Sequence, residues 1–386
     1  MHTHIQRCLK LDLPQGQSCF LWGARKTGKS TFLKENFPQA TYIDLLKADV
    51  YQSYLRDPSR LRQEILANTL SSLIILDEVQ KVPLLLDEVH WLIEAQKNLQ
   101  FILCGSSARR LKSTGANLLG GRAWRYNFLP LCYPEMKSLD WKRIFNHGLI
   151  PSHYLAEKPT KHFAAYLSDY LLTEVQFEAK LRNRDHFARF LETLGFCHGE
   201  LINYSNIARD CGVDSKTVRS YFEILEDMYL GYILSPYRSR VSRQTIQEAS
   251  KFYLFDTGIA NYLRNYEFKD MRGAEAGKAF EHYIFLELMA YKLLTEKRDP
   301  LNFWRTKEGH EVDFIVQNQA IEVKISSSIE KRDLKGLLLF GEHYGAKLNI
   351  ISFEPRKRLA IVDGQEVTLW PVQDFLDTLW AGEFWT

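Results

Sequence analysis

The sequence has no Cys-x-x-Cys pair, although it contains six cysteines, at positions 8, 19, 104, 132, 197 and 211. Their irregular spacing and mostly apolar surroundings argue against a zinc site and against a disulfide framework. We therefore expect reduced thiols that pack in the core.

Long hydrophobic runs are also absent. No stretch of about eighteen apolar residues occurs, and the first residues lack the apolar region of a signal peptide. These features predict a soluble, cytoplasmic protein without a membrane partner. Charge of one sign is scarce too, because 50 Lys and Arg face 47 Asp and Glu, giving a formal charge of +3. Any nucleic-acid surface must therefore be a local patch.

The chain is long enough for more than one hydrophobic core. It has 386 residues, of which 45% are hydrophobic and 25% are charged. This size and globular composition predict two or three domains.

The run from Gly23 to Ser30 matches the phosphate-binding P-loop signature and follows an apolar stretch. Glycines at both ends let the backbone wrap a phosphate, Lys29 adds charge, and Ser30 can ligate magnesium. The pattern predicts ATP with Mg²⁺ as the ligand. The residues expected to bind it are Gly23, Ala24, Arg25, Lys26, Thr27, Gly28, Lys29, Ser30, Thr31, Ser106 and Ser107.

Apolar runs at 41–45, 73–76, 101–104 and 124–128 alternate with segments that can form helices, which predicts an α/β fold with a parallel sheet. The run at 73–76 ends in Asp77 and Glu78, at the sheet edge where such folds bind ligands. This pattern resembles a Walker B motif. The resemblance implies that Asp77 holds magnesium and that Glu78 activates the attacking water. A helix N-cap with a first-turn acid is the structural alternative.

Two further features resemble those of AAA-type ATPases. Ser106 and Ser107 end a strand at the spacing of the sensor-1 residue, and either can contact the γ-phosphate or water. Arg122 lies on a Gly-rich loop and resembles the arginine that stabilises transition-state charge, in cis or in trans. An exposed loop arginine is the structural alternative, and Arg109 or Arg110 is an alternative for the same role.

Helical periodicity from Phe163 to Leu194 predicts a small helical lid. The segment 204–221 then carries a helix-turn-helix pattern, and two strand-like runs enclose a basic tip, as in a winged helix. DNA is the expected partner, although a winged helix can also be a structural module or bind a protein. The expected DNA contacts are Lys216, Thr217, Arg219, Arg238, Arg240 and Arg243.

The fragment Glu322-x-Lys324 is weak evidence by itself, because the same doublet recurs at 178–180 and 214–216. Its surroundings predict the order helix, three strands, helix, strand. That order resembles the core of PD-(D/E)xK nucleases, in which carboxylates hold divalent ions. The resemblance implies Lys324 as a catalytic residue and Mg²⁺ or Mn²⁺ as the metal. The expected ligands are Glu281, Asp313 and Glu322, with Glu311 as a plausible addition; a decayed nuclease fold is the alternative.

The whole chain resembles a broad family of predicted AAA-type ATPases, of the AAA_14/DUF4143 type. The resemblance implies four regions: a P-loop core at 1–135, a helical lid at 136–194, a winged helix at 195–258 and a nuclease-like domain at 259–386. It also implies a homo-oligomer formed through the ATPase domain. The expected function is ATP-dependent DNA processing in genome maintenance or defence. The alternatives are an ATP-driven switch that cuts no bond and a helicase loader or remodeller.

Overall fold

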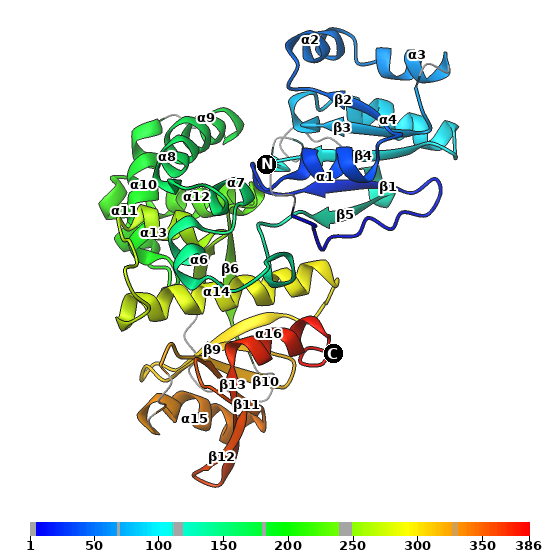
Figure 1. Ribbon diagram of the computed structural model, residues 1–386. Coiled ribbons are helices and arrows are strands. Elements are labelled where there is room, and N and C mark those ends of the chain that lie inside the picture. Colours follow the sequence, from blue (N-terminus) through cyan, green and yellow to red (C-terminus); the bar gives the residue numbers. More distant parts are fainter. Residues whose placement is uncertain are drawn as a thin grey trace.

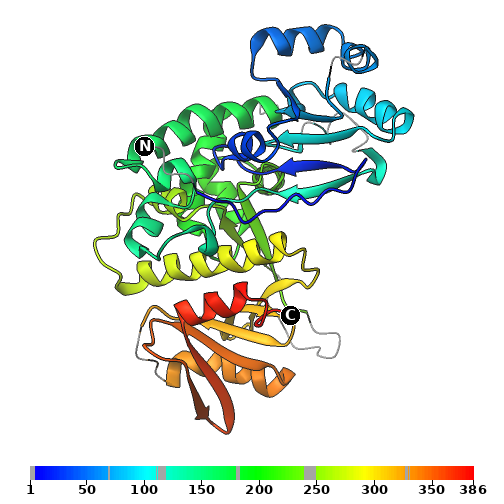
Figure 2. The ribbon, with the colours of Figure 1, turned by 45° about the vertical axis from the view of Figure 1, so that its right-hand side comes forward.

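The computed structural model describes residues 5–67, 70–109, 111, 119–179, 183–238, 249–326, 329 and 331–386. Three regions follow one another along the chain (Figure 1): an α/β region, a mainly helical region and a second α/β region. The long helix α14 (Gly273–Leu294) runs between the helical region and the last sheet in both ribbon views (Figures 1 and 2).

The first region is built on an all-parallel sheet with the strand order β2-β3-β4-β1-β5. This confirms the parallel sheet predicted from the alternation of strands and helices. The strands are β1 (Ser18–Trp22), β2 (Thr41–Asp44), β3 (Leu73–Asp77), β4 (Gln100–Gly105) and β5 (Ala123–Asn127); the helices are α1 (Lys29–Asn36), α2 (Ala48–Arg56), α3 (Arg60–Leu66) and α4 (Leu85–Ala95). Short 3₁₀ turns are η1 (Val79–Lys81), η2 (Leu119–Gly121) and η3 (Tyr133–Glu135).

The middle region is a cluster of helices with one hairpin. Its helices are α6 (Trp141–His147), α7 (Pro151–Tyr154), α8 (Pro159–Ala164), the π-helix η4 (Ala165–Leu171), α9 (Leu172–Ala179), α10 (Arg184–Cys197), α11 (Tyr204–Cys211), α12 (Ser215–Asp227) and α13 (Thr257–Leu263). The hairpin consists of β6 (Gly231–Pro236) and β7 (Lys251–Leu254). Gly212, in the left-handed conformation, ends α11 and makes the turn into α12, where the helix-turn-helix pattern predicts it.

The hairpin does not stand alone as a free wing. Beyond its pairing with β7, strand β6 pairs in parallel with β8, through Ser235 and Pro236, and so joins the C-terminal sheet. That sheet has the order β12-β13-β11-β10-β9-β8-β6-β7. The hairpin therefore couples the helical region to the C-terminal region through backbone hydrogen bonds.

The C-terminal region follows the predicted order of helix, three strands, helix and strand. These elements are α14, β8 (Leu301–Arg305), β9 (Glu311–Val316), β10 (Gln319–Val323), α15 (Lys335–Tyr344), preceded by η5 (Lys331–Leu334), and β11 (Lys347–Ser352). Three further elements, which no sequence pattern predicted, complete the region: β12 (Arg358–Val362), β13 (Gln365–Pro371) and α16 (Val372–Trp380). Lys324 lies just past the end of β10, and its amide donates to the Ile351 carbonyl.

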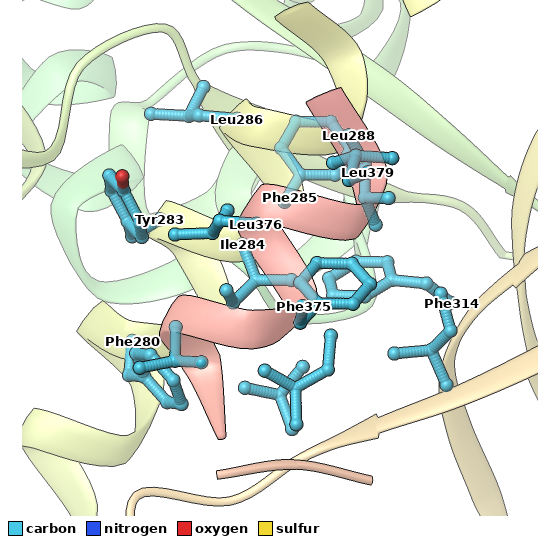
Figure 3. Close-up of a cluster of buried hydrophobic side chains, with 14 of the residues drawn as sticks. Phe280, Tyr283, Ile284, Phe285, Leu286, Leu288, Phe314, Phe375, Leu376 and Leu379 are labelled. Carbon is cyan, nitrogen blue, oxygen red and sulfur yellow. The ribbon is translucent and has the colours of Figure 1, made fainter. Parts of the chain in front are cut away.

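Helix α14 forms the centre of the largest core. Its apolar side chains pack against α16 and against Phe314 of β9 (Figure 3). On another face, Trp141 of α6 makes edge contacts with Phe280 and Tyr283, at ring-centroid distances of 5.3 and 5.2 Å. One helix thus buries apolar surface against two regions at once.

The middle region also docks on the first sheet. Tyr229 stacks on Trp22 of β1 with ring centroids 6.4 Å apart. Asp227, at the end of α12, accepts from Arg109 at 3.0 Å, and the Ala108 amide donates to its carbonyl at 3.3 Å. The loop after β4 is therefore tied directly to α12.

Among the described residues, no helix combines the length and the apolar character that crossing a bilayer requires, and this includes α14 with its 22 residues.

The buried Glu287 of α14 generates a pH prediction. Its carboxylate accepts from the Tyr133 amide at 2.9 Å and from Trp380 Nε1 at 3.0 Å, and burial raises its pKa from 4.5 to about 7. The folded protein therefore holds this proton more tightly than the unfolded chain does. The stability that the proton contributes is present below about pH 4.5 and is lost as the pH rises through about 7.

The Glu287→Gln side chain cannot ionise, so this variant should not lose stability as the pH rises through about 7. Between pH 5 and pH 8, the unfolding free energy of the variant should rise relative to wild type by about 2–3 kcal/mol. Urea unfolding at both pH values measures the difference, with the exposed Glu342→Gln as the control. Parallel pH profiles for wild type and Glu287→Gln would contradict the prediction.

Candidate nucleotide site and acidic cluster

The loop between β1 and α1 has the backbone of a phosphate cradle. Gly28 has a φ of 100°, which favours glycine, and it caps the start of α1. A Cβ at Gly23 would lie 2.0 Å from the Phe128 carbonyl oxygen. Both glycines are therefore required by the fold of the loop, and the helix N-terminus points its free amides at the ligand position.

Side chains of the loop are held from several sides. Lys29 Nζ donates to the carbonyls of Gly23 and Ala24 at 2.8 and 2.9 Å, and the Thr27 hydroxyl donates to Ala24 at 2.8 Å. Arg7 Nη1 donates to the Thr27 carbonyl at 2.6 Å. No sequence pattern predicts this role for Arg7, because the residue lies in a segment without a motif.

The Asp77 carboxylate at the end of β3 is contacted from α1 and from β2. Ser30 Oγ donates to Asp77 Oδ2 at 2.6 Å, and the Tyr42 hydroxyl donates to the same oxygen. Asp77 is 2% exposed. Burial, followed by the charge of Asp77, raises the pKa of Tyr42, so this phenol stays protonated as a donor. Ser30 and Asp77 together offer the hard oxygen atoms that Mg²⁺ prefers.

Glu78 sits beside a polar network at the ends of β3 and β4. Its φ of 61° is in the left-handed region, an unfavourable conformation for a residue other than glycine. Oε2 accepts from Gln80 at 2.6 Å and from Ser106 at 3.2 Å. Gln80 was missed by the motif analysis, which had no pattern for it. Ser107 has a different role, because its Oγ accepts from the Arg109 amide at 3.2 Å.

A cavity of about 1000 Å³ lies over the P-loop, lined by Arg25, Lys26 and Thr31 among others, and by four side chains of the middle region. Those four are Pro151, Ser152, Leu155 and His162. Arg25 also pairs with Glu174 of α9 at 2.7 Å. The volume, the cradle and the Ser30–Asp77 pair all fit a nucleotide with Mg²⁺.

Arg122 lies at the amino ends of the parallel strands, whereas the P-loop lies at their carboxyl ends. It directly precedes β5, whose first residue pairs with Ser18, whereas the P-loop follows the far end of β1. Strands of this length place it roughly 16 Å from its own phosphate site. Arg122 is paired with Glu94 and its side chain is 41% exposed. That distance is longer than an arginine side chain spans, so the structure does not bring Arg122 to its own phosphate site, while a role in trans stays open; Arg110 lies outside the described residues.

The expected DNA contacts fall into three groups. Lys216 and Arg219 are exposed on α12, and the Arg219 guanidinium lies 4.8 Å from the Tyr204 ring centroid. Thr217 instead completes the helix cap, since its amide and hydroxyl both donate to Asp214, at 2.8 and 3.0 Å. Arg238 is exposed, and Arg240 and Arg243 lie outside the described residues.

The structure brings the expected nuclease residues together in one cavity of about 280 Å³. Its lining includes Glu281 of α14, Asp313 of β9, Glu322 of β10 and the adjacent Lys324. Glu311, the plausible addition, lines it too. The middle region adds Lys251, Tyr253 and His198, which the sequence analysis missed because they lie far from the motif.

The charged groups of this cluster shift one another's pKa values. Burial raises the pKa of Asp313, as do the neighbouring Glu322 and Glu281, and burial raises the pKa of Glu322 to about 7. Lys324 Nζ pairs with Glu322 Oε1 at 2.6 Å. Burial by itself would lower the pKa of Lys324, but Glu322 and Asp313 raise it above its ordinary value.

One oxygen of the cluster lacks a partner among the described residues. Glu322 Oε2 is buried and makes no hydrogen bond, while Asp313 Oδ2 accepts from the Val323 amide at 2.8 Å. An unpartnered buried carboxylate oxygen is costly unless a cation or donor reaches it. The donor set therefore fits a divalent ion held by hard oxygen ligands.

Comparisons with known proteins give the class of the first region. Residues 15–137 match the AAA domain family, residues 138–270 match a domain of unknown function (DUF8612), and residues 276–375 match another (DUF4143). The chain thus carries an AAA-type, ATPase-like domain followed by two domains of unknown function. A similar chain is an uncharacterized protein of Haemophilus influenzae, 21% identical over 374 residues, covering 83% of this chain and 88% of the relative.

The P-loop geometry predicts the effect of removing its ammonium group. Lys29→Ala should weaken ATP binding by at least about a hundredfold, because a charge-assisted contact to phosphate is lost. Isothermal titration with ATP and Mg²⁺ measures this. Lys34→Ala, on the same helix but near Tyr42, is the matched control and should bind as wild type does. Equal affinities for both variants would overturn the assignment.

Proposed function

We propose that this protein is an ATP-hydrolysing, DNA-binding enzyme whose C-terminal region cleaves phosphodiester bonds with a divalent metal. The observation that carries the proposal is the meeting of Glu281, Asp313, Glu322 and Lys324 in one cavity, in a chain that also has a nucleotide site. ATP with Mg²⁺ is the proposed cofactor of the first region, and Mg²⁺ or Mn²⁺ that of the second.

In the ATPase region, Lys29 would leave the loop carbonyls and pair with phosphate, while Ser30 and Asp77 would hold Mg²⁺. The bound ion would neutralise phosphate charge during transfer. Glu78 is placed to accept a proton from water, and Gln80 and Ser106 hold its carboxylate in position. This arrangement supports hydrolysis over simple binding.

A homo-oligomer completes this site. Arg122 lies at the sheet edge opposite its own P-loop, so it can stabilise transition-state charge only in a neighbouring subunit. Its partner Glu94 holds it at the surface in the single chain. In the proposed oligomer, the amino ends of the strands in one subunit, with Arg122, face the P-loop of the next subunit. This arrangement accounts for the distance of Arg122 from its own P-loop and for its position at the surface.

In the C-terminal region, Asp313 and Glu322 would hold the metal, with Glu281 as a further ligand. The ion would lower the pKa of a bound water and polarise the phosphate. Lys324, already paired with Glu322, is placed to orient the attacking water or to stabilise negative charge on the phosphate oxygens. Lys216, Arg219 and Arg238 are the described basic residues proposed to contact the DNA backbone.

Contacts between the P-loop region and the middle region would let the bound nucleotide affect DNA binding. Arg25 of the P-loop pairs with Glu174, and the loop after Ser106 contacts the end of α12 through Ala108 and Arg109. Binding of a γ-phosphate would draw Arg25 away from Glu174 by charge. We propose that this loosens the middle region and changes how α12 presents Lys216 and Arg219.

A second candidate function is an ATP-driven switch or loader that binds DNA or a protein without cutting. One observation favours it: the cluster already contains cations, since Lys251 and Lys324 pair with its carboxylates. Such pairing is also what a decayed nuclease fold would show. Cleavage assays separate the two functions.

Subunit mixing tests the trans role of Arg122. Arg122→Ala and Glu78→Gln should each lower ATP turnover by at least about a hundredfold when pure. Mixed together, they should recover part of the wild-type rate, because some interfaces then join an intact Arg122 to an intact Glu78. Arg125→Ala on the exposed part of β5 is the control. Absence of recovery in stable mixed oligomers would rule out the arrangement.

Cleavage of plasmid and linear DNA with Mg²⁺ or Mn²⁺, with and without ATP, tests the nuclease. Lys324→Ala and Glu322→Gln should each reduce cutting at least about a hundredfold, while leaving ATP hydrolysis unchanged. Lys347→Ala, an exposed lysine at the start of β11, should cut normally. Cutting that survives Lys324→Ala would come from a contaminant, and no cutting by wild type would favour the switch.

A further inference from the structure

The acidic cluster contains a buried lysine that comes from outside the C-terminal region. Lys251 is the first residue of β7 and its side chain is 5% exposed. Its Nζ lies 2.5 Å from Glu311 Oε1 and 3.4 Å from Glu281 Oε1. A fully buried ammonium is rare unless it is paired, so these carboxylates define its position.

Backbone pairing fixes this lysine in place. Lys251 pairs with Leu234 in the hairpin and forms a bridge with Leu201. The ammonium group also lies 5.5 Å from the Phe303 ring centroid, on the strand that joins the hairpin to the C-terminal sheet. Strand pairing thus fixes the backbone of Lys251, and the carboxylates of the cluster fix its ammonium group.

The cluster divides into two halves. In the first, Lys251 bridges Glu281 and Glu311, Arg305 pairs with Glu311 Oε2 at 2.6 Å, and Tyr253 donates to Glu281 Oε1 at 2.5 Å. In the second, Lys324 pairs with Glu322 Oε1, Asp313 Oδ2 accepts from the Val323 amide, and Glu322 Oε2 has no partner among the residues described. The carboxylate oxygen that a further cation can reach, Glu322 Oε2, therefore belongs to the second half.

The overall charge supports the same division. Five carboxylates, on Glu200, Glu281, Glu311, Asp313 and Glu322, face four cations, on Lys251, Lys278, Lys324 and Arg305. The net charge of one negative unit suits a single divalent ion. Two ions would leave a large positive excess before a phosphate binds, at close range in a poorly screened cavity.

We propose that Lys251 takes the place of a second divalent ion, so that this cavity holds one metal ion, beside Asp313 and Glu322, and one fixed ammonium, between Glu281 and Glu311. This inference rests on the proposed metal-dependent function of the cavity. In this arrangement the middle region supplies one residue of the acidic cavity, Lys251. It also makes the site a one-metal centre whose second cation is supplied by the chain.

The test counts bound Mn²⁺ by isothermal titration and by electron paramagnetic resonance of free Mn²⁺, without nucleotide. The Asp77→Asn background removes the carboxylate proposed to hold an ion at the P-loop. The full-length protein should bind one ion that is lost in Glu322→Gln. Lys251→Met should bind two, because Glu281 and Glu311 are then free to hold the second.

Three variants control for charge and folding. Lys251→Arg keeps the cation and should bind one ion. Lys278→Met removes a cation that lines the same cavity but pairs with Glu200 at 2.7 Å, and it should also bind one ion. Lys251→Gln removes the charge but keeps a donor, and it replaces Lys251→Met if the methionine variant does not fold. Circular dichroism and a thermal melt report folding in each case.

The outcomes separate this inference from the proposed function. One ion in wild type and one in both neutral Lys251 variants would overturn the inference and leave the metal site standing. Two ions in wild type would overturn it as well. No ion sensitive to Glu322→Gln in wild type would overturn the inference and the proposed metal site together.

Discussion

The packing of α14 on two sides holds the molecule together. One face of the helix buries Phe285 and Leu288 against α16 and the C-terminal sheet (Figure 3). On another face, Phe280 and Tyr283 contact Trp141 of the middle region. A helix that is apolar around most of its circumference must be covered on most sides. The position of α14 therefore fixes where Glu281 lies, and with it one wall of the acidic cavity.

Both charged sites depend on the middle region. The nucleotide cavity is closed by residues such as Pro151 and Leu155, and the acidic cavity by Lys251 and Tyr253. The middle region is itself tied to the first sheet through Tyr229 and to the last sheet through β6. A shift of the middle region therefore changes the walls of both cavities at once, which gives the two sites a physical means of coupling.

Local patterns were enough to predict the parallel sheet of the first region and the order of elements from α14 to β11, but not β12, β13 and α16. The P-loop at Gly23 to Gly28 and the alternation of strands and helices along the first region were predictable because glycine conformation and apolar periodicity act over a few residues. Arg7, Gln80 and Lys251 were not predictable, because each reaches its site from a segment whose sequence shows only ordinary loop or strand character. The position of Arg122 at the far edge of the sheet also required the strand pairing, which no spacing along the chain reveals.

The pairing of β6 with β8 explains why a winged-helix reading of the sequence is incomplete. A free wing would leave its basic tip to contact phosphate and nothing else. Here β6 continues into the C-terminal sheet, and β7 carries Lys251 into the acidic cavity. The hairpin thus joins the middle region to the C-terminal sheet through β6 and supplies a buried cation to the acidic cavity through β7.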